Sequence, residues 1–193
     1  MTRIVVVDNG GQFTHLESRA LGDIGVDTDL IDNTTPPDEI DADGLVLSGG
    51  PDSANDPDAG GRCDEYLALE IPVLGICLGM QLMATARGGT VAAGEYGGYA
   101  DVTVEIEDES DPLVGPIAPE TRVWASHADR VTTLPEGFER TGTSEICEIE
   151  SMSDPKSALY GVQWHPEVTH TEEGEELFAN FRAVCERTSK GES

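Results

Sequence analysis

The first half of the chain alternates short apolar runs with segments whose apolar residues recur at helical spacing. The apolar runs predict strands at about 3–8, 28–31, 44–47 and 72–76. The helical spacing predicts helices over about 16–24, 62–70 and 78–87, each stopped by glycine or proline. Strands that alternate with helices are typical of a doubly wound, mostly parallel sheet flanked by helices.

The pattern changes between residues 91 and 163. Val102, Val104 and Ile106 alternate with polar residues, as in strands with one face in water, and Ile146 and Ile149 repeat this weakly. We expect an antiparallel layer added to the α/β core, a last strand over 158–163 that returns to the central sheet, and an acidic-fronted helix over 172–187. A chain of this length predicts a single domain, 1–193.

The charge balance is strongly acidic, with 38 Asp and Glu against 11 Lys and Arg and a net charge of -27. Such a chain is a poor ligand for nucleic acid or anionic membranes, so neither is an expected partner. The acidic residues are spread along the whole sequence, which favours adaptation to high salt, where screening removes their repulsion. An acidic surface that serves only solubility is the alternative.

The four cysteines, Cys63, Cys77, Cys147 and Cys185, are far apart in the sequence and form no C-x-x-C pair. This spacing predicts no metal site, and it fits reduced thiols in the cytoplasm. No apolar run approaches the roughly 18 residues that a membrane-spanning helix needs.

A candidate nucleophile lies in Gly75-Ile76-Cys77-Leu78-Gly79, where a predicted strand turns into a predicted helix. This is the G-x-nucleophile-x-G elbow, in which glycines let strand and helix approach closely around a strained turn. The positive end of the following helix favours the reactive thiolate. A buried core cysteine is the competing interpretation of this short motif.

A candidate base and its orienting partner follow the last predicted strand, in Val162-Gln-Trp-His-Pro-Glu167. Residues two apart in an extended chain share one face, so His165 and Glu167 can act together. His165 would move the proton and Glu167 would hold its tautomer, which completes a triad with Cys77. Taken alone, the triplet is equally compatible with a surface turn.

The loop Leu47-Ser-Gly-Gly-Pro51 follows a buried predicted strand and is a candidate anion nest. The N–H groups of Gly50 and Leu78 would form an oxyanion hole, with each donor contributing about 3 kcal/mol in the transition state. An ordinary Gly-Pro loop is the alternative.

In this order, Ser48-Gly-Gly-Pro51, Gly75-Ile-Cys-Leu-Gly-Met-Gln81 and Gly161-Val-Gln-Trp-His-Pro-Glu-Val168 resemble the class I, triad-type glutamine amidotransferases, over nearly the whole chain. Asp8-Asn-Gly-Gly-Gln-Phe-Thr14 and Val123-Trp-Ala-Ser-His-Ala-Asp129, with Pro166-Glu-Val-Thr-His-Thr171, are similar to the glutaminase part of GMP synthases. No nucleotide-binding half follows, so the resemblance is to the archaeal arrangement with two separate subunits.

This resemblance implies a flavodoxin-like fold and a Cys77, His165, Glu167 triad, with Gly50 and Leu78 as the oxyanion hole. It also implies that Gln81, Ser126 and His127 contact L-glutamine. The implied partner is an ATP-pyrophosphatase-type subunit that aminates xanthosine monophosphate to GMP. ATP and Mg²⁺ would belong to that partner, and no cofactor is expected in this chain.

Two alternatives stay open at this stage: an amidotransferase subunit of another pathway, such as anthranilate or carbamoyl-phosphate synthesis, and an inactive regulatory homologue. The sequence also departs from the family pattern. Leu78 stands where tyrosine is common, and Gly94-Glu-Tyr-Gly97 stands where Arg-Glu-Tyr-Gly is common. The second departure puts in doubt any partner contact made by that arginine.

Overall fold

The structure is a computed structural model that describes residues 1–191, apart from the side chains of residues 95–100. The described chain holds these strands: β1 Arg3–Asp8, β2 Asp27–Asp32, β3 Gly44–Leu47, β4 Val73–Ile76, β5 Thr90–Ile106, β6 Glu120–Thr133, β7 Glu139–Thr143, β8 Ser151–Asp154 and β9 Leu159–Val162. Its helices are α1 Thr14–Asp23, α2 Cys63–Tyr66, α3 Leu78–Ala86 and α4 Gly174–Ser189, with short 3₁₀ turns η1 Pro37–Glu39 and η2 Gly115–Ile117. None of the described helices is long and apolar enough to cross a membrane.

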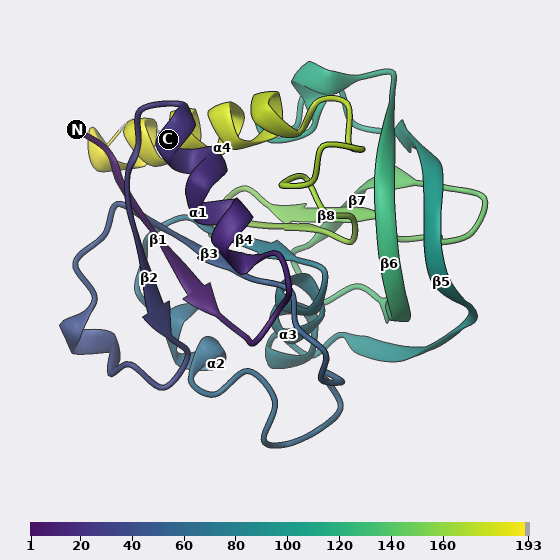
Figure 1. The fold of residues 1–193 in the computed structure, drawn as a ribbon, viewed down its shortest axis with the longest axis horizontal. Helices are drawn as coiled ribbons and strands as arrows, with labels where there is room; N and C mark the ends of the chain where they lie inside the picture. Colours follow the sequence, from purple (N-terminus) through teal and green to yellow (C-terminus); the bar gives the residue numbers. More distant parts are fainter. Residues whose placement is uncertain (192–193) are drawn as a thin grey trace.

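Within the described residues, nine strands form one mixed sheet in the order β2-β1-β3-β4-β9-β8-β7-β5-β6. The first five strands in this order, β2-β1-β3-β4-β9, pair in parallel, as the alternation of strands and helices predicts. Helices α1 and α4 cover one face of the parallel part, and α3 lies on the other (Figure 1). The predicted α/β class with a doubly wound parallel core is confirmed.

The antiparallel strands continue this sheet beyond β9 and do not form a separate layer. The long β5–β6 ribbon joins β7 only through Glu105 and Ile106, and Figure 1 shows the ribbon turned across the direction of β7 and β8. Val102, Val104 and Ile106 are buried, which confirms the predicted alternation in this segment. The turned ribbon brings its middle part close to the end of β4.

Two predicted elements differ from the structure. The helix expected over 62–70 is only the four-residue α2, because the chain continues in turns to Glu70, whose φ is 56°. Ile146 and Ile149 lie in the irregular connection between β7 and β8, not in a strand. The neighbouring strands carry buried hydroxyls in place of apolar residues, such as Thr141 and Ser151, whose oxygens lie 2.8 Å apart. Apolar periodicity therefore could not reveal those strands.

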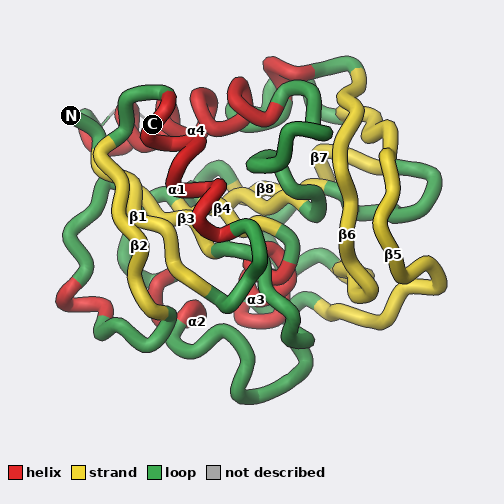
Figure 2. Tube along the Cα trace, in the orientation of Figure 1, coloured by secondary structure: helices red, strands yellow, loops and turns green. Residues whose placement is uncertain are grey.

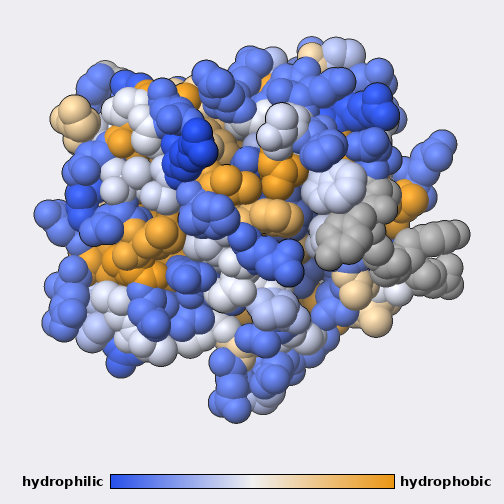
Figure 3. Space-filling model, in the orientation of Figure 1, coloured by the Kyte–Doolittle hydropathy of each residue, from blue (hydrophilic) through white to orange (hydrophobic). Residues whose placement is uncertain are grey.

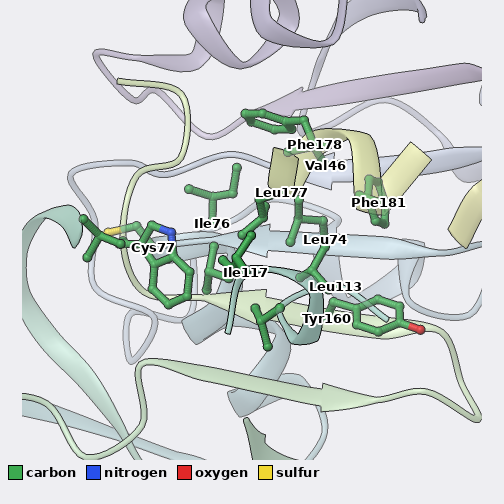
Figure 4. Packing of buried hydrophobic residues seen from close by; sticks show 14 of the residues in the cluster. Val46, Leu74, Ile76, Cys77, Leu113, Ile117, Tyr160, Leu177, Phe178 and Phe181 are labelled. Atoms are coloured by element: carbon green, nitrogen blue, oxygen red, sulfur yellow. The ribbon is translucent and has the colours of Figure 1, made fainter. Parts of the chain in front are cut away.

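Two apolar clusters, one for each face of the sheet, hold the fold together. In the first, Phe178 and Phe181 of α4 pack on Leu74 and Ile76 of β4, as Figure 4 shows. These side chains are fully buried, and a large core side chain of this kind contributes about 1.5–3 kcal/mol by its burial. The end of β4, where Cys77 follows, is thus anchored in the buried core of the molecule.

Hydrophilic residues cover most of the face drawn in Figure 3. The edge strand β2 carries Asp27, Asp29 and Asp32, and of these Arg3 pairs with Asp27 at 2.9 Å and with Asp29 at 3.7 Å. Acidic side chains on an edge strand discourage pairing with another chain. With 38 acids and 11 basic residues in the sequence, most acidic side chains have no basic counterpart.

The excess of acidic side chains predicts a salt-dependent stability. We expect the melting temperature to rise as KCl increases from about 0.1 M to the molar range, because the screening length falls from about 10 Å to about 3 Å. Thermal melts at graded KCl test this, with equal osmolality of a nonionic osmolyte as the control. A melting temperature that stays flat or falls with KCl would restore simple solubility as the role of the charge.

Candidate active site

Cys77 lies at a sharp turn between β4 and α3. Its φ is 52° and its ψ is -108°, a backbone conformation that non-glycine residues rarely adopt. A Cβ atom on Gly75 would lie 2.6 Å from the carbonyl carbon of Gly79, and one on Gly79 would lie 2.1 Å from the carbonyl oxygen of Leu47. Both flanking glycines are therefore required, and the chain has the elbow geometry that the spacing predicts.

The fold brings His165 and Glu167 to Cys77 because β9 pairs in parallel with β4, with Val162 opposite Ile76. The carboxyl ends of the two strands therefore meet at one edge of the sheet. His165 Nδ1 lies 2.6 Å from Glu167 Oε1. Burial lowers the pKa of His165, but the hydrogen bonds and negative charges of Cys77 and Glu167 outweigh it and raise the pKa to about 11. The imidazole is thus held in its charged form beside Cys77.

The backbone of His165 is tied to β6 directly and through the hydroxyl of Thr171. His165 N–H donates to the carbonyl of Trp124 at 3.1 Å. The hydroxyl of Thr171 donates to the carbonyl of His165 at 2.6 Å and accepts from Trp124 N–H at 3.1 Å. Phe13 adds an edge-on ring contact to the imidazole, with centroids 5.5 Å apart. Thr171, the last residue of the Pro166-to-Thr171 motif, therefore helps to hold the imidazole in place.

The glycine loop after β3 packs directly against the elbow. A Cβ atom on Gly50 would lie 2.3 Å from the carbonyl oxygen of Asn9 and 2.8 Å from the Leu78 side chain. Asn9 clamps the loop, since its backbone N–H donates to Ser48 Oγ and its side chain donates to the Ser48 carbonyl, both at 2.9 Å. Figure 2 draws the chain between β3 and α2 as loop, and the Asn9 contacts help to hold its first residue, Ser48. Leu78 is the first residue of α3, and its N–H is free of the helix ladder.

Gln81 shares the face of α3 with Cys77, as its position four residues later predicts. It is 3% exposed, and its amide nitrogen donates to the carbonyl of Asp129 at 2.9 Å and to Gln163 Oε1 at 3.1 Å. Gln163, whose importance the sequence did not reveal, in turn lies 3.6 Å from Cys77 Sγ through its own amide nitrogen. Both protons of the Gln81 amide are thus engaged, and its carbonyl oxygen is the group left to contact a ligand.

Ser126 and His127 approach Cys77 from the middle of β6. The Cys77 thiol lies 3.7 Å from the backbone carbonyl of Ser126. His127 Nδ1 lies 2.9 Å from the carbonyl oxygen of Asp129, which can only accept, so this nitrogen carries the proton. Burial lowers the pKa of His127, and the ring is neutral. His127 thus contacts the backbone of Asp129, whereas the carboxylate of Asp129 accepts from Ser53 Oγ at 2.8 Å.

These groups surround one pocket of about 540 Å³, in the range of small-molecule sites. All the candidate residues predicted from the sequence line it, namely Gly50, Cys77, Leu78, Gln81, Ser126, His127, His165 and Glu167. The sequence did not reveal Phe13 and Glu17 of the N-terminal segment, which also line the pocket. Asp52 and Asp129 are further lining residues, and their charge favours a ligand with an amino group.

Comparison with known proteins identifies the family. The family model described as "Glutamine amidotransferase class-I" matches residues 5–184. The chain belongs to the class-I glutamine amidotransferases. This amidotransferase is 73% identical over 185 residues to the glutamine-hydrolyzing GMP synthase subunit of Natronomonas pharaonis, covering 96% of this chain and 98% of the relative. The protein of the same name from Haloarcula marismortui is 67% identical over 189 residues and 98% of both chains.

A solved structure supports the same assignment. The crystal structure of a putative GMP synthase subunit from Thermoplasma acidophilum matches this amidotransferase with a TM-score of 0.92 at 35% identity. The match covers 98% of this chain and 96% of that chain. The fold predicted from the sequence resemblance and the fold observed here are therefore the same.

Among the described residues of this amidotransferase, one group of side chains could hold a metal ion. Ligand atoms of His127, Cys147 and Glu150 lie within 4.8 Å of one another. Two of the three are already engaged, since the Cys147 thiol donates to the carbonyl of Ile149 and Glu150 accepts from Ser144 Oγ at 2.6 Å. The charge of Arg130 acts on both His127 and Cys147 and opposes a cation there. The group is better described as a buried polar cluster in the wall behind the pocket.

Glu150 in this cluster predicts a pH-dependent stability. It is fully buried with Oε2 unpartnered, and burial raises its pKa to about 7. The unfolded chain releases this proton first, so the free energy of unfolding falls by about 3 kcal/mol as pH rises from about 4.5 to 7. Glu150→Gln removes this loss, and urea unfolding should show a variant more stable than wild type at about pH 8 but not at about pH 5. Glu148→Gln, on an 82% exposed side chain, is the matched control; equal curves for the Glu150→Gln variant and wild type would contradict the assignment.

Proposed function

We propose that this chain is the glutaminase subunit of a GMP synthase. It hydrolyses L-glutamine through a thioester at Cys77 and delivers ammonia to a separate ATP-pyrophosphatase-type subunit, which aminates xanthosine monophosphate to GMP. The observation that carries the proposal is the convergence of an elbow cysteine, a charged imidazole and a carboxylate 2.6 Å from that imidazole in one pocket. The relatives named as glutamine-hydrolyzing GMP synthase subunits support the choice of partner.

In the proposed first step, Cys77 Sγ attacks the side-chain carbonyl carbon of glutamine and forms a carbon–sulfur bond. The oxygen of the tetrahedral intermediate accepts from the N–H groups of Gly50 and Leu78. Gly50 suits this role because its loop packs on the Leu78 side chain, and each donor of an oxyanion hole contributes about 3 kcal/mol. These donors are preorganised by the Asn9 clamp and by the start of α3.

In the proposed second step, the carbon–nitrogen bond breaks and the nitrogen takes a proton from His165 to leave as ammonia. Neutral His165 then accepts a proton from water, whose oxygen attacks the thioester carbon. The carbon–sulfur bond breaks, glutamate leaves, and Cys77 and charged His165 are restored. Glu167 holds the Nδ1–H tautomer and stabilises the imidazolium through its hydrogen bond of 2.6 Å. No cofactor takes part in this hydrolysis.

The proposed glutamine contacts follow from the donors and acceptors that remain free. Gln81 offers its carbonyl oxygen, because both of its amide protons are engaged. His127 offers Nε2 as an acceptor, because Nδ1 carries the ring proton. Ser126 lines the pocket, and its hydroxyl is proposed as a further contact. Acceptors together with the acidic lining suit the α-ammonium group of L-glutamine.

The proposed function is tested with the purified chain and a GMP-forming synthetase subunit. We expect ammonia release from glutamine, and GMP formation from glutamine, ATP, Mg²⁺ and xanthosine monophosphate only when both subunits are present. Ammonium salts should support GMP formation by the partner even with a Cys77→Ala chain, which controls for partner activity. Glutamine hydrolysis that no GMP-forming subunit can use would favour a different amidotransferase pathway, and no hydrolysis at all would favour a regulatory homologue.

A further inference from the structure

Glu17 places a second carboxyl group in the wall of the proposed glutaminase site. It lies on α1, four residues after Phe13, so the two share a helical face, and both line the pocket. Glu17 is only 1% exposed. Its carboxyl group accepts a hydrogen bond from the N–H of Gly49, in the glycine loop next to the proposed oxyanion donor Gly50. Glu17 therefore touches the loop whose position decides whether an oxyanion can be held.

Two buried oxygens in this wall lack a hydrogen-bond donor, Glu17 Oε2 and Glu167 Oε2. A buried carboxylate oxygen without a donor is strongly unfavourable, and two buried carboxylates near each other repel. Burial raises the pKa of Glu17 well above its usual value, and the charge of Glu167 raises it further, whereas His165 and the Gly49 hydrogen bond oppose the rise. A proton on Glu17 would remove the repulsion and would supply a hydrogen-bond donor to this wall.

We propose that Glu17 is a positioning residue: its protonated carboxyl group donates to Glu167 Oε2 and accepts from Gly49 N–H, and so ties the glycine loop to the triad carboxylate. This inference rests on the proposed function. A neutral Glu17 leaves Glu167 as the only carboxylate bound to His165, so the imidazole keeps one orientation. Glu17 also links the glycine loop to the proposed triad, because Gly49 packs against His165. A Cβ atom on Gly49 would lie 3.2 Å from the imidazole ring.

The charged groups around Glu17 define what its protonation would change. Glu167 and His165, from the segment after β9, and Cys77, from the elbow, all act on its titration. Asp52 and Asp129 add negative charge to the same pocket wall. An ionised Glu17 would compete with Glu167 for the imidazolium and weaken the tie to the loop.

The test compares Glu17→Gln with Glu17→Leu in the full chain. Glutamine keeps the shape, the donor and the acceptor of a protonated glutamate, so kcat and the pH profile should stay within about threefold of wild type. Leucine keeps the bulk but not the hydrogen bonds, and kcat should fall roughly 10- to 100-fold with little change in KM, as expected for a loop displaced by about 1 Å. Equal losses in both variants would mean that a charge is required, and no loss in the leucine variant would mean that the tie is dispensable. Either result would overturn the proposal.

A second measurement does not depend on activity or on the substrate. Infrared difference spectra near neutral pH should show a protonated carboxyl band in wild type that Glu17→Gln removes. Glu150→Gln, which removes the other buried carboxyl group with a raised pKa, should leave this band in place. A wild-type spectrum without this band contradicts the proposal even if the leucine variant fails to fold. If wild type does not hydrolyse glutamine, the proposed function fails while the infrared result still decides the state of Glu17.

Discussion

Cys77→Ala is expected to abolish glutamine hydrolysis, with a fall in kcat on the order of 10⁴-fold or more. Without a thiol no thioester can form, and water would have to attack an unactivated amide. The folded structure should survive, because alanine adds no atoms at this position and the flanking glycines still allow the turn. Ammonia release by the variant and by wild type, measured at the same high salt, gives the ratio.

A glutamine-mimicking electrophile should label Cys77 and no other cysteine. Burial raises the pKa of Cys63 and of Cys147 to about 12, and it also raises the pKa of Cys185, so these thiols stay protonated and unreactive at neutral pH. Cys77 has a charged imidazole as its neighbour and lines the pocket. Mass mapping of the adduct locates the label, and Cys147→Ser provides a control that should still be labelled at Cys77. An adduct on another cysteine, or activity that survives in Cys77→Ala, would refute the nucleophile assignment.

The parallel half of the sheet could be predicted because its strands are buried on both faces. β3 and β4 consist of four buried residues each, and such continuous apolar runs are visible in any sequence. The elbow could be predicted for a related reason. Gly75 and Gly79 have no alternative where strand, turn and helix pack against one another, so the constraint is written in the residue types themselves.

The sequence concealed elements whose buried residues are polar. Strands β7 and β8 bury Thr141 and Ser151 through a hydroxyl pair, so their pattern is not apolar. The location of Ser126 and His127 inside β6 was hidden as well, because the regular alternation of buried residues in β6 ends at Ala125.

Glu17 was overlooked because the buried face of α1 does not follow the apolar residues alone. Thr14, Glu17 and Leu21 are the buried residues of α1, and they recur at intervals of three and four. The sequence did contain a signal, since Glu17 lies four residues before the fully buried Leu21. A glutamate at such a position indicates either a mistaken helical phase or a buried carboxyl group with a function, and here it is buried in the wall of the pocket.

The sequence separation within the proposed triad explains why its geometry needed the fold. Cys77 follows β4, and His165 follows β9, yet these strands are neighbours because β5 to β8 lie beyond β9 in the sheet. Motif order alone is compatible with several strand orders. The parallel register that places Val162 beside Ile76 is what brings imidazole and thiol together.

His165→Ala should be nearly as damaging as Cys77→Ala, lowering kcat by about 10³- to 10⁴-fold, because no other group can protonate the leaving ammonia. The double variant Cys77→Ala/His165→Ala should be no worse than either single variant, since triad members act as a unit. Glu167→Gln should retain at least about tenfold more activity than His165→Ala, because the imidazole remains in place. Turnover measured for all four proteins tests this order. A double variant whose loss equals the product of the single losses would show that Cys77 and His165 act independently.

His165→Ala should also change how the free energy of unfolding depends on pH. The pKa of His165 is raised to about 11 in the folded chain from about 6.5 unfolded, so its contribution is fully present below about pH 6.5 and is lost as pH rises through about 11. Wild type should therefore exceed His165→Ala in the free energy of unfolding by most at low pH, and the two curves should converge as pH approaches 11. Urea unfolding across this range measures the difference, with His15→Ala on an exposed histidine as the control. A constant difference between wild type and His165→Ala at all pH values would mean that the imidazole contributes only packing. The assignment of a charged His165 in the resting site would then be wrong.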